Sequence, residues 1–298
     1  MIAILTALET EYAAIRAHLI STKRHEHAKG TIFEVGVLAA RPTCRVALAA
    51  TGMTNLNAAL LTERAIAEFN PSTTMFVGVA GGRRDWLQLG DVVVATRVYS
   101  YHGGRSEDTR FRVRPRAWEI SHRAEQVARW LSRSSDWYPS AAEAPAPVVH
   151  FAPIAAGDVV LDSQTSDVAQ HLDDHYNDAI AVEMESAGFA AAGQVNEHVV
   201  SVTIRGISDG AGGAKEQTDN KGWQQIAARN AAAFAAAVAA ELGDESETGA
   251  GEPAADPATP PTPQVHNTNI AKHNATVGYQ LGINHGELHS GTDPRDRS

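Results

Sequence analysis

An apolar stretch that ends abruptly in two carboxylates constrains the fold of this 298-residue chain more than any other feature. It reads Ala179-Ile-Ala-Val-Glu-Met-Glu-Ser-Ala-Gly-Phe189. Its β-branched, apolar part predicts a short buried strand, and the small residues from Ser186 onward predict the start of a helix. Glu183 and Glu185 are therefore expected at a point where a strand meets a helix.

A second apolar stretch, from Val199 to Asp209, also ends in an acid. Ligand crevices of open α/β sheets form at the carboxyl ends of parallel strands, so we expect the three acids to converge on one pocket. Apolar stretches alternate with helical patterns along the rest of the chain, which predicts an α/β fold. Further strands are expected at 2–7, 31–39, 45–50, 73–79, 91–101 and 148–156, and further helices at 9–19, 56–69, 118–131 and 223–242, with a turn at 41–43.

Composition narrows the class of protein. The 43% of hydrophobic residues allows a sizeable core, and a net charge of −10 argues against a protein that coats nucleic acid. Cys44 is the only cysteine, so no intramolecular disulfide can form, which suits the reducing cytoplasm. Residues 1–9 lack the pattern of a signal peptide, and no stretch approaches the roughly 20 apolar residues of a membrane span. We expect a soluble, cytoplasmic protein without a nucleic-acid or membrane partner.

Four motifs, in the expected order along the chain, resemble the nucleoside phosphorylase superfamily. Within it, they are similar to the purine phosphorylases and the methylthioadenosine/S-adenosylhomocysteine nucleosidases. The resemblance covers residues 1 to 242 and implies a mixed central sheet flanked by helices, a purine nucleoside or nucleotide as ligand, and a homo-oligomer. The motifs are Gly78-Val-Ala-Gly-Gly82, Gly90-Asp-Val-Val-Val94, Val182-Glu-Met-Glu185 and Arg205-Gly-Ile-Ser-Asp209.

The resemblance assigns roles to the acids. Cleavage of an N-glycosidic bond leaves positive charge on the sugar and negative charge on the base, so a catalyst must protonate the base and hold the sugar. Asp209 is implied as the proton donor to purine N7, and Glu185 as the acceptor of hydrogen bonds from the ribose hydroxyls. Met184 is implied as an apolar wall against the sugar. Arg205 either orients Glu183 or Glu185 or forms a buried structural ion pair.

Other residues of the motifs are expected to bind the substrate. Ala80 and Gly81 are implied as lining for the base and ribose; glycines that simply let a helix pack closely are the alternative. Val160 and Leu161 are candidates for the floor under the purine. Glu183 and Ser208 complete the expected substrate-binding set. No His/Cys cluster has metal-ligand spacing, so neither a metal nor another cofactor is expected.

The nucleophile is left open between water and phosphate. Leu8-Glu-Thr-Glu11 resembles a nucleosidase motif whose glutamate activates water, which would make Glu11 a general base. The alternative is a phosphate-dependent phosphorylase of nucleoside salvage, with the anion held by Gly52, Thr54 and an arginine. Hydrolysis is favoured because no arginine clearly matches the anion site of the phosphorylases.

Five arginines lie within residues 102–116 of a chain that is otherwise acidic. Exposed arginines are commonly solvated surface. Beside a nucleoside pocket, however, Arg105 and Arg110 could bind the phosphates of a nucleotide such as ATP.

The composition changes at Gly243, which divides the chain into a catalytic domain (1–242), a Pro/Ala/Glu-rich linker (243–265), a candidate signalling motif (266–290) and a disordered terminus (291–298). The stretch around Tyr279-Gln-Leu-Gly282 resembles bacterial amyloid-signalling motifs related to the RIP homotypic interaction motif. That resemblance implies an effector recruited to an NLR-type receptor; plain disorder is the alternative. A catalytically inactive nucleoside-binding module is a further alternative for the whole protein.

Overall fold

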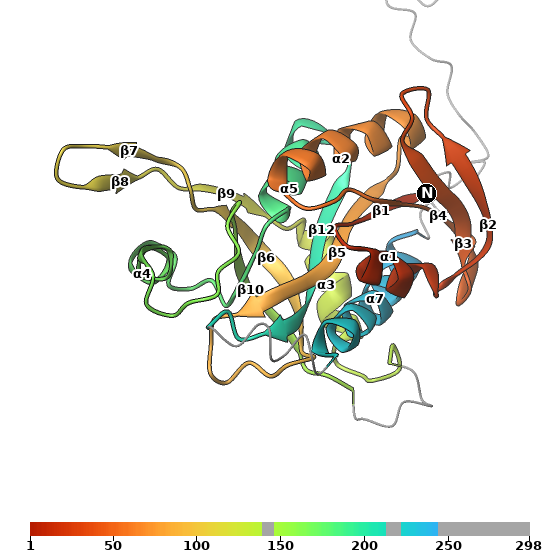
Figure 1. Cartoon of the computed structure of the whole chain (residues 1–298). Helices are drawn as coiled ribbons and strands as arrows, with labels where there is room; N and C mark the ends of the chain where they lie inside the picture. Colours follow the sequence, from red (N-terminus) through yellow and green to blue (C-terminus); the bar gives the residue numbers. More distant parts are fainter. Residues whose placement is uncertain (139–145, 213–221, 244–298) are drawn as a thin grey trace, which may run out of the picture. The chain divides into compact units, whose positions relative to one another are not determined.

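The computed structural model describes residues 1–138, 146–212 and 222–243 (Figure 1). Nearly every predicted apolar stretch forms a strand and nearly every helical pattern a helix. The strands are β1 (Ile2–Thr6), β2 (Leu19–Glu26), β3 (Ile32–Leu38), β4 (Arg41–Ala50), β5 (Thr73–Gly82), β6 (Val92–Ser100), β7 (Gly104–Ser106), β8 (Phe111–Val113), β9 (Arg116–Glu119), β10 (Val149–Ala156), β11 (Ala181–Glu183) and β12 (Val200–Asp209). The helices are α1 (Glu9–Arg16), α2 (Asn55–Phe69), α3 (His122–Leu131), α4 (Asp167–His175), α5 (Ser186–Val195) and α7 (Trp223–Leu242).

The main sheet is mixed and has the order β11-β10-β6-β12-β5-β1-β4-β3-β2, with β9 paired to β6. Its centre is parallel: β12, β5, β1 and β4 run in the same direction. The residues of β1, β5 and β12 are buried almost throughout, as expected of strands covered on both faces. The predicted α/β fold, a mixed central sheet flanked by helices, is confirmed.

The short strand β11 closes part of this sheet into a ring. It is parallel to β10 on one side and antiparallel to β5 on the other, where Ala181 pairs with Gly82 and Val182 with Gly81. The strands β5, β12, β6, β10 and β11 therefore hydrogen-bond in a closed circuit. Because β11 is held on both edges, Glu183 at its end and Glu185 just after it start from a fixed backbone.

Helices cover both faces of the sheet (Figure 1). The Ala-rich helix α7 packs on β12 and β5 together with α1 and α3, while α2 and α5 lie on the opposite face. α2 and α5 approach very closely, since a Cβ on Gly188 would overlap the backbone of Asn55. This glycine brings the beginning of α2 next to the beginning of α5, where Glu185 lies.

The structure corrects several predicted boundaries. The expected turn at 41–43 belongs to β4, because Leu38 pairs with Arg41 and leaves only two residues for the turn. Trp118 belongs to β9, where it pairs with Val98, and α3 begins only after Ser121, whose hydroxyl accepts a hydrogen bond from Ala124 N. The helix expected at 9–19 ends at Arg16, and the chain continues directly into β2.

The loop expected at 102–116 contains the hairpin β7–β8, which projects from the sheet in Figure 1. The helix α4 had no counterpart in the prediction. Most of the linker predicted at 243–265, the motif at 266–290 and the terminus at 291–298 lie outside the described residues. In the part of the chain that is described, no helix combines the length and the apolar character needed to cross a membrane.

Candidate active site

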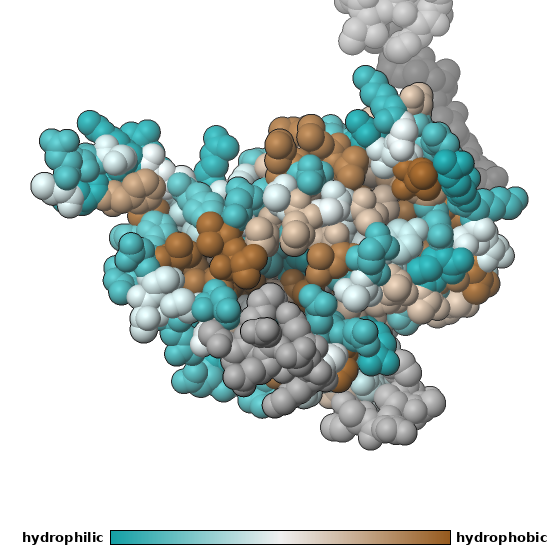
Figure 2. Space-filling view, in the orientation of Figure 1, coloured by the Kyte–Doolittle hydropathy of each residue, from teal (hydrophilic) through white to brown (hydrophobic). Residues whose placement is uncertain are grey.

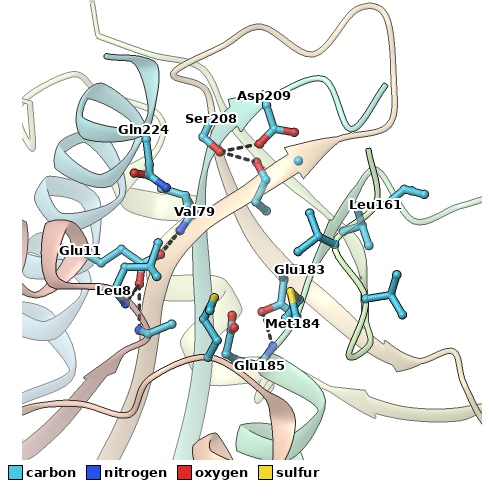
Figure 3. Close-up of a pocket in the computed structure, with 17 residues that line it drawn as sticks. Leu8, Glu11, Val79, Leu161, Glu183, Met184, Glu185, Ser208, Asp209 and Gln224 are labelled. Atoms are coloured by element: carbon cyan, nitrogen blue, oxygen red, sulfur yellow. Dashed lines mark hydrogen bonds between the residues drawn. The ribbon is translucent and has the colours of Figure 1, made fainter. Parts of the chain in front are cut away.

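The carboxyl ends of β1, β5, β11 and β12 meet around a cavity of about 200 Å³. Glu11, Glu185 and Asp209 all line it, and Figure 3 shows them on different sides of the same space. They come from α1, the junction of β11 with α5, and the end of β12. Two of the three acids expected to converge, Glu185 and Asp209, meet here with Glu11, and the third, Glu183, also lines the cavity.

Glu11 is fixed by backbone hydrogen bonds. Its Oε2 accepts from Ala7 N at 2.8 Å and Leu8 N at 2.9 Å, and its Oε1 accepts from Val79 N at 2.8 Å. Burial of the carboxylate nevertheless raises the pKa of Glu11, and the opposing effects of Arg205 and these three N–H groups do not cancel it. Glu11 is therefore a stronger base than an exposed glutamate, held in one orientation.

Arg205 lies at the centre of the acids. It is fully buried, and its Nη2 forms an ion pair with Glu183, donates to Ser186 Oγ at 2.9 Å and lies 3.5 Å from Glu185 Oε2. Gly78 leaves room for this arrangement, because a Cβ there would overlap both Arg205 and Glu11. Arg205 thus partly neutralises a buried cluster that would otherwise be strongly negative.

Glu183 lines the cavity but directs its carboxylate to the start of α5. It accepts hydrogen bonds from Glu185 N at 3.1 Å, Ser186 N at 3.1 Å and Ser186 Oγ at 2.9 Å. The carboxylate thereby satisfies N–H groups that have no partner within the helix. The geometry of Glu183 is that of a helix cap paired with Arg205.

Because Glu183 caps the helix, the side chain of Glu185 faces the cavity. Its Oε1 accepts only a long hydrogen bond, 3.4 Å, from Thr54 N. Burial, followed by repulsion from Glu183 and Glu11, raises the pKa of Glu185 to about 7, although Arg205 and Thr54 N act in the opposite direction. Near neutral pH this carboxyl group is therefore close to half ionised.

Asp209 is held at the end of β12 by its own neighbours. Its Oδ2 accepts from Ser208 Oγ at 2.9 Å, and its Oδ1 accepts from Ala211 N at 2.9 Å. Both Ser208 and Asp209 line the cavity, and both are buried. The two hydrogen bonds fix the carboxyl group without covering it from the cavity.

The other residues expected around a substrate divide into two groups. Ala80, Gly81, Leu161 and Met184 line the cavity, and so does Val160 (Figure 3). The second group does not line the cavity and consists of Gly52, Thr54, Arg105 and Arg110.

Gly52 and Thr54 belong to this second group. Gly52 forms a turn with φ of 71°, and Thr54 adopts φ of 97° while its Oγ1 accepts from Asn57 N at the start of α2. Their structural role is to begin α2, and the N–H of Thr54 is used by Glu185. Phosphate binding at this turn stays a prediction.

Arg105 and Arg110 lie on the exposed β7–β8 hairpin and do not line the cavity of their own chain. Together with Arg112 they surround Glu107, with Nε to carboxylate distances of 3.8, 3.1 and 2.8 Å for Arg105, Arg110 and Arg112. The cluster of arginines is therefore partly neutralised by an acid on the same hairpin.

Sequence reasoning missed several cavity residues. Leu8, Met53, Val159 and Gln224 also line the cavity. Met53 and Val159 are 54% and 42% exposed and contribute apolar surface at the mouth of the cavity. Leu8, Met53 and Val159 are apolar residues within or beside the predicted motifs, and this position in the sequence was the available signal.

A set of hydrogen bonds among Asp158, Asn55 and Gly188, called the Asn55–Asp158 clasp below, lies beside the mouth of the cavity and was also missed. Asp158 Oδ1 accepts from Asn55 N at 3.2 Å and from Asn55 Nδ2 at 3.0 Å, while Asn55 Oδ1 accepts from Gly188 N at 3.0 Å. The clasp ties the floor segment before Val159 to both α2 and α5.

Among the residues that the structure describes, no three His, Cys, Asp or Glu side chains are grouped so as to hold a metal ion.

Comparison with known proteins places this site in a family. The family model described as the phosphorylase superfamily matches residues 1–240. The chain belongs to the phosphorylase superfamily. Over 111 residues this phosphorylase-superfamily member is 36% identical to a 5'-methylthioadenosine/S-adenosylhomocysteine nucleosidase of Mycobacterium bovis. That alignment spans 37% of the chain and 42% of the relative, less than half the length of each protein.

Two further proteins resemble this superfamily member. ATP nucleosidase Cap17 of Escherichia coli is 25% identical over 174 residues, which is 52% of this chain and 34% of Cap17. The crystal structure of the methylthioadenosine/S-adenosylhomocysteine nucleosidase of Neisseria meningitidis, in complex with methylthio-immucillin-A, superposes with a TM-score of 0.67 at 24% identity. It covers 80% of this chain and 98% of that one, and at this identity it supports the fold.

Proposed function

We propose that this protein hydrolyses the N-glycosidic bond of an adenine nucleoside or nucleotide. The observation that carries the proposal is the meeting of Glu11, Glu185 and Asp209 around one cavity, where each accepts hydrogen bonds from backbone N–H groups. The names of two relatives, a methylthioadenosine nucleosidase and an ATP nucleosidase, support adenine as the base. Membership of the phosphorylase superfamily supports the bond to be cleaved.

Glu11 acts as the general base in this proposal. A carboxylate has about four acceptor positions, and three of those on Glu11 are used by backbone N–H groups. One remains, on Oε1, for a water molecule. Glu11 takes a proton from this water as its oxygen bonds to the anomeric carbon, and the raised pKa of the glutamate favours that transfer.

Asp209 serves the leaving group. As the bond between the anomeric carbon and base nitrogen N9 breaks, its electron pair passes to the purine, and Asp209 donates a proton to N7. The products are the free base and the sugar with a new hydroxyl group. One proton has moved to Glu11 and one has left Asp209, so exchange with solvent restores both groups for the next turnover.

Glu185 and Met184 hold the sugar. Among the described residues, the hydrogen bonds that the Glu185 carboxylate accepts are long, at 3.4 and 3.5 Å, so its oxygens can also accept hydrogen bonds from the ribose hydroxyls. The ionised form of Glu185 also stabilises the positive charge that develops on the sugar. Met184 supplies an apolar contact at the same point of the cavity.

Water is favoured over phosphate as the nucleophile. Within the described part of the chain, no arginine or lysine lines the cavity, and the buried Arg205 behind it is engaged with carboxylates. An incoming phosphate would meet three acids without a dedicated cation. Phosphate-dependent cleavage in nucleoside salvage is the alternative, and it would require a cation from elsewhere.

Release of free adenine tests the reaction. Methylthioadenosine, adenosine and ATP are incubated with the full-length protein, with and without inorganic phosphate, and adenine is measured by chromatography. Release that is independent of phosphate, and at least 100-fold slower in Asp209→Asn, supports the proposal. Glu9→Gln, an exposed carboxylate on α1, is the matched control. Strict dependence on phosphate would identify a phosphorylase, and an unimpaired Asp209→Asn would remove Asp209 from its role.

Assembly is part of the proposal. Leu56 and Leu60 on α2 are 68% and 57% exposed, and Figure 2 shows apolar surface over this helix. An apolar helix face of this kind supports a homo-oligomer. Size-exclusion chromatography with light scattering of Leu56→Glu/Leu60→Glu against the unchanged protein tests it; a monomer in both cases would refute it.

We further propose that the protein acts in the cytoplasm as an effector, recruited to an NLR-type receptor through residues 266–290. Support comes from the sequence alone, because these residues lie outside those described. Fibres formed by a synthetic 266–290 peptide, and loss of the cellular effect when 243–298 are deleted, are the expected results. A peptide that stays monomeric would contradict the proposal, and an unchanged role after the deletion would favour salvage. Absence of all cleavage would favour an inactive nucleoside-binding module.

A further inference from the structure

A second cavity, of about 530 Å³, adjoins the first and shares two of its lining residues, Leu161 and Asp209. Figure 3 shows these two residues at separate points around the first cavity, Asp209 at its upper end and Leu161 at its side. The rest of the second cavity is formed by the β5–β6 connection, by α4 with the segment before it, and by the residues that follow β12. Nothing in the proposed cleavage reaction uses this space.

The two arginines of the second cavity are already engaged by acceptors of the protein itself. Arg83 donates to two backbone carbonyls at 2.9 and 3.2 Å and forms an ion pair with Asp173 at 2.6 Å. Arg84 donates to the carbonyl of Arg83 at 2.9 Å and to that of Asn177. Because these guanidinium groups are occupied by protein acceptors, the cavity does not require an anionic ligand.

Apolar and polar side chains share the lining of the second cavity. Leu161 and Leu87 are 8% exposed, Ala169 is 5% exposed, and Leu89 is partly buried beside them. The polar part of the lining comes from Asp85, Ser163 and Gln164. A ligand group that fits here is uncharged, with an apolar part that contacts the leucines.

The position of Asp209 relates this space to the base. In the proposed reaction, on which this inference rests, Asp209 donates a proton to purine N7. The 6-amino group lies beside N7 on the same edge of adenine, so a substituent on that nitrogen extends past Asp209, away from the sugar. Asp209 and Leu161 are the two residues that border both cavities, and the path between the cavities therefore begins at this edge of the base.

We propose that the second cavity is a binding site for an apolar substituent on the 6-amino nitrogen of the base. The enzyme would then cleave N6-alkylated or N6-arylmethylated adenine nucleosides as well as unsubstituted ones. Unsubstituted adenine would leave the second cavity to water, so its cleavage does not depend on this space.

Gly210 offers a direct test. It lines the second cavity, its φ is not in the left-handed region, and a Cβ built on it meets no atom within 4 Å. Gly210→Trp should therefore fold and place an indole in or over the cavity, whereas Gly210→Ala is too small to fill it and is the matched control. Leu89→Ala enlarges the same space.

The assay compares one nucleoside with and without an N6-benzyl group, using adenosine or methylthioadenosine, whichever the full-length protein cleaves faster. The expected kcat/KM of the benzylated substrate in the unchanged protein is within about tenfold of the unsubstituted one. Gly210→Trp should lower kcat/KM for the benzylated substrate at least tenfold more than for the unsubstituted one. Gly210→Ala should change neither, and Leu89→Ala should favour larger N6 groups relative to the unsubstituted substrate.

Two results would overturn the inference while leaving the proposed function intact. One is rapid cleavage of the unsubstituted nucleoside with rejection of the benzylated one by more than 100-fold. The other is an equal loss of both substrates in Gly210→Trp. Failure of the unchanged protein to cleave or bind any unsubstituted adenine nucleoside would instead remove the proposed function, and this inference with it.

Discussion

Replacing Glu185 by glutamine should stabilise the protein at alkaline pH, although it removes a group proposed to hold the sugar. Burial, with repulsion from Glu183 and Glu11, raises the pKa of Glu185 from 4.5 to about 7 in the folded protein. A glutamine of nearly the same shape carries no charge at any pH. The variant therefore avoids the cost of ionising a buried group, and it does so only where the wild-type glutamate is ionised.

The sign and size of the effect follow from proton linkage. A raised folded-state pKa stabilises the protein fully below the unfolded-state value of 4.5, and this contribution is lost as the pH rises through about 7. The difference between the two pKa values corresponds to about 3 kcal/mol in the free energy of unfolding. The Glu185→Gln variant lacks this loss, so its stability relative to wild type should increase by about 3 kcal/mol between pH 4.5 and pH 9.

Thermal unfolding measured from pH 5 to pH 9 tests this prediction. For a domain of this size, about 3 kcal/mol corresponds to a Tm difference of roughly 6–12 °C at the alkaline end. Glu9→Gln, which neutralises an exposed carboxylate on α1, should show no such trend. A Tm difference that is independent of pH, or that grows towards acid, would refute the reasoning. Adenine release by Glu185→Gln should fall at least tenfold above pH 7, where the wild-type glutamate is ionised, and by less towards acid.

Three further changes probe the supporting structure. Glu11→Gln should lower adenine release by about 10²–10⁴-fold with little change in Tm, since the base is lost while most backbone contacts remain; full activity would exclude Glu11 as the base. Arg205→Met should cost about 3–5 kcal/mol in unfolding free energy, measured by denaturant titration, because it leaves Glu183 uncompensated; a neutral effect would contradict the ion pair's role. Gly188→Ala should cost about 1–3 kcal/mol and reduce kcat, because its Cβ overlaps the backbone of Asn55; behaviour like that of Gly210→Ala would show that the helices can separate freely.

The convergence of the acids was predictable because it depends on strand ends. Glu185 and Asp209 follow apolar stretches, and the ends of strands in one sheet lie near one another whatever the details of packing. The predictions for Glu185 and Asp209 therefore needed only hydrophobic periodicity. Glu11 was named because Leu8-Glu-Thr-Glu11 resembles a nucleosidase motif, since an acidic first turn alone does not distinguish a catalytic residue.

Contacts between distant segments were not predictable in the same way. The Asn55–Asp158 clasp joins residues 103 positions apart, and neither residue type signals a partner at that separation. The sequence that follows Trp118 predicted a helix beginning at this residue, but Trp118 pairs with Val98 and belongs to a strand. The arginines around Arg105 could be recognised in the sequence, but the sequence did not indicate where their side chains lie. In the structure their hairpin projects from the sheet, and Glu107 forms an ion pair with Arg105.

The strand circuit closed by β11 also bears on how the substrate range of such a protein can change. The backbone that carries Glu183, Gly81 and Asp209 is pinned by neighbouring strands, so it tolerates little remodelling. The segments around Met53, Val159 and Gly210 lie outside that circuit and border the ligand spaces without forming ladder hydrogen bonds. Directed evolution of new specificity should therefore accumulate its successful substitutions in these three segments and leave the closed circuit untouched.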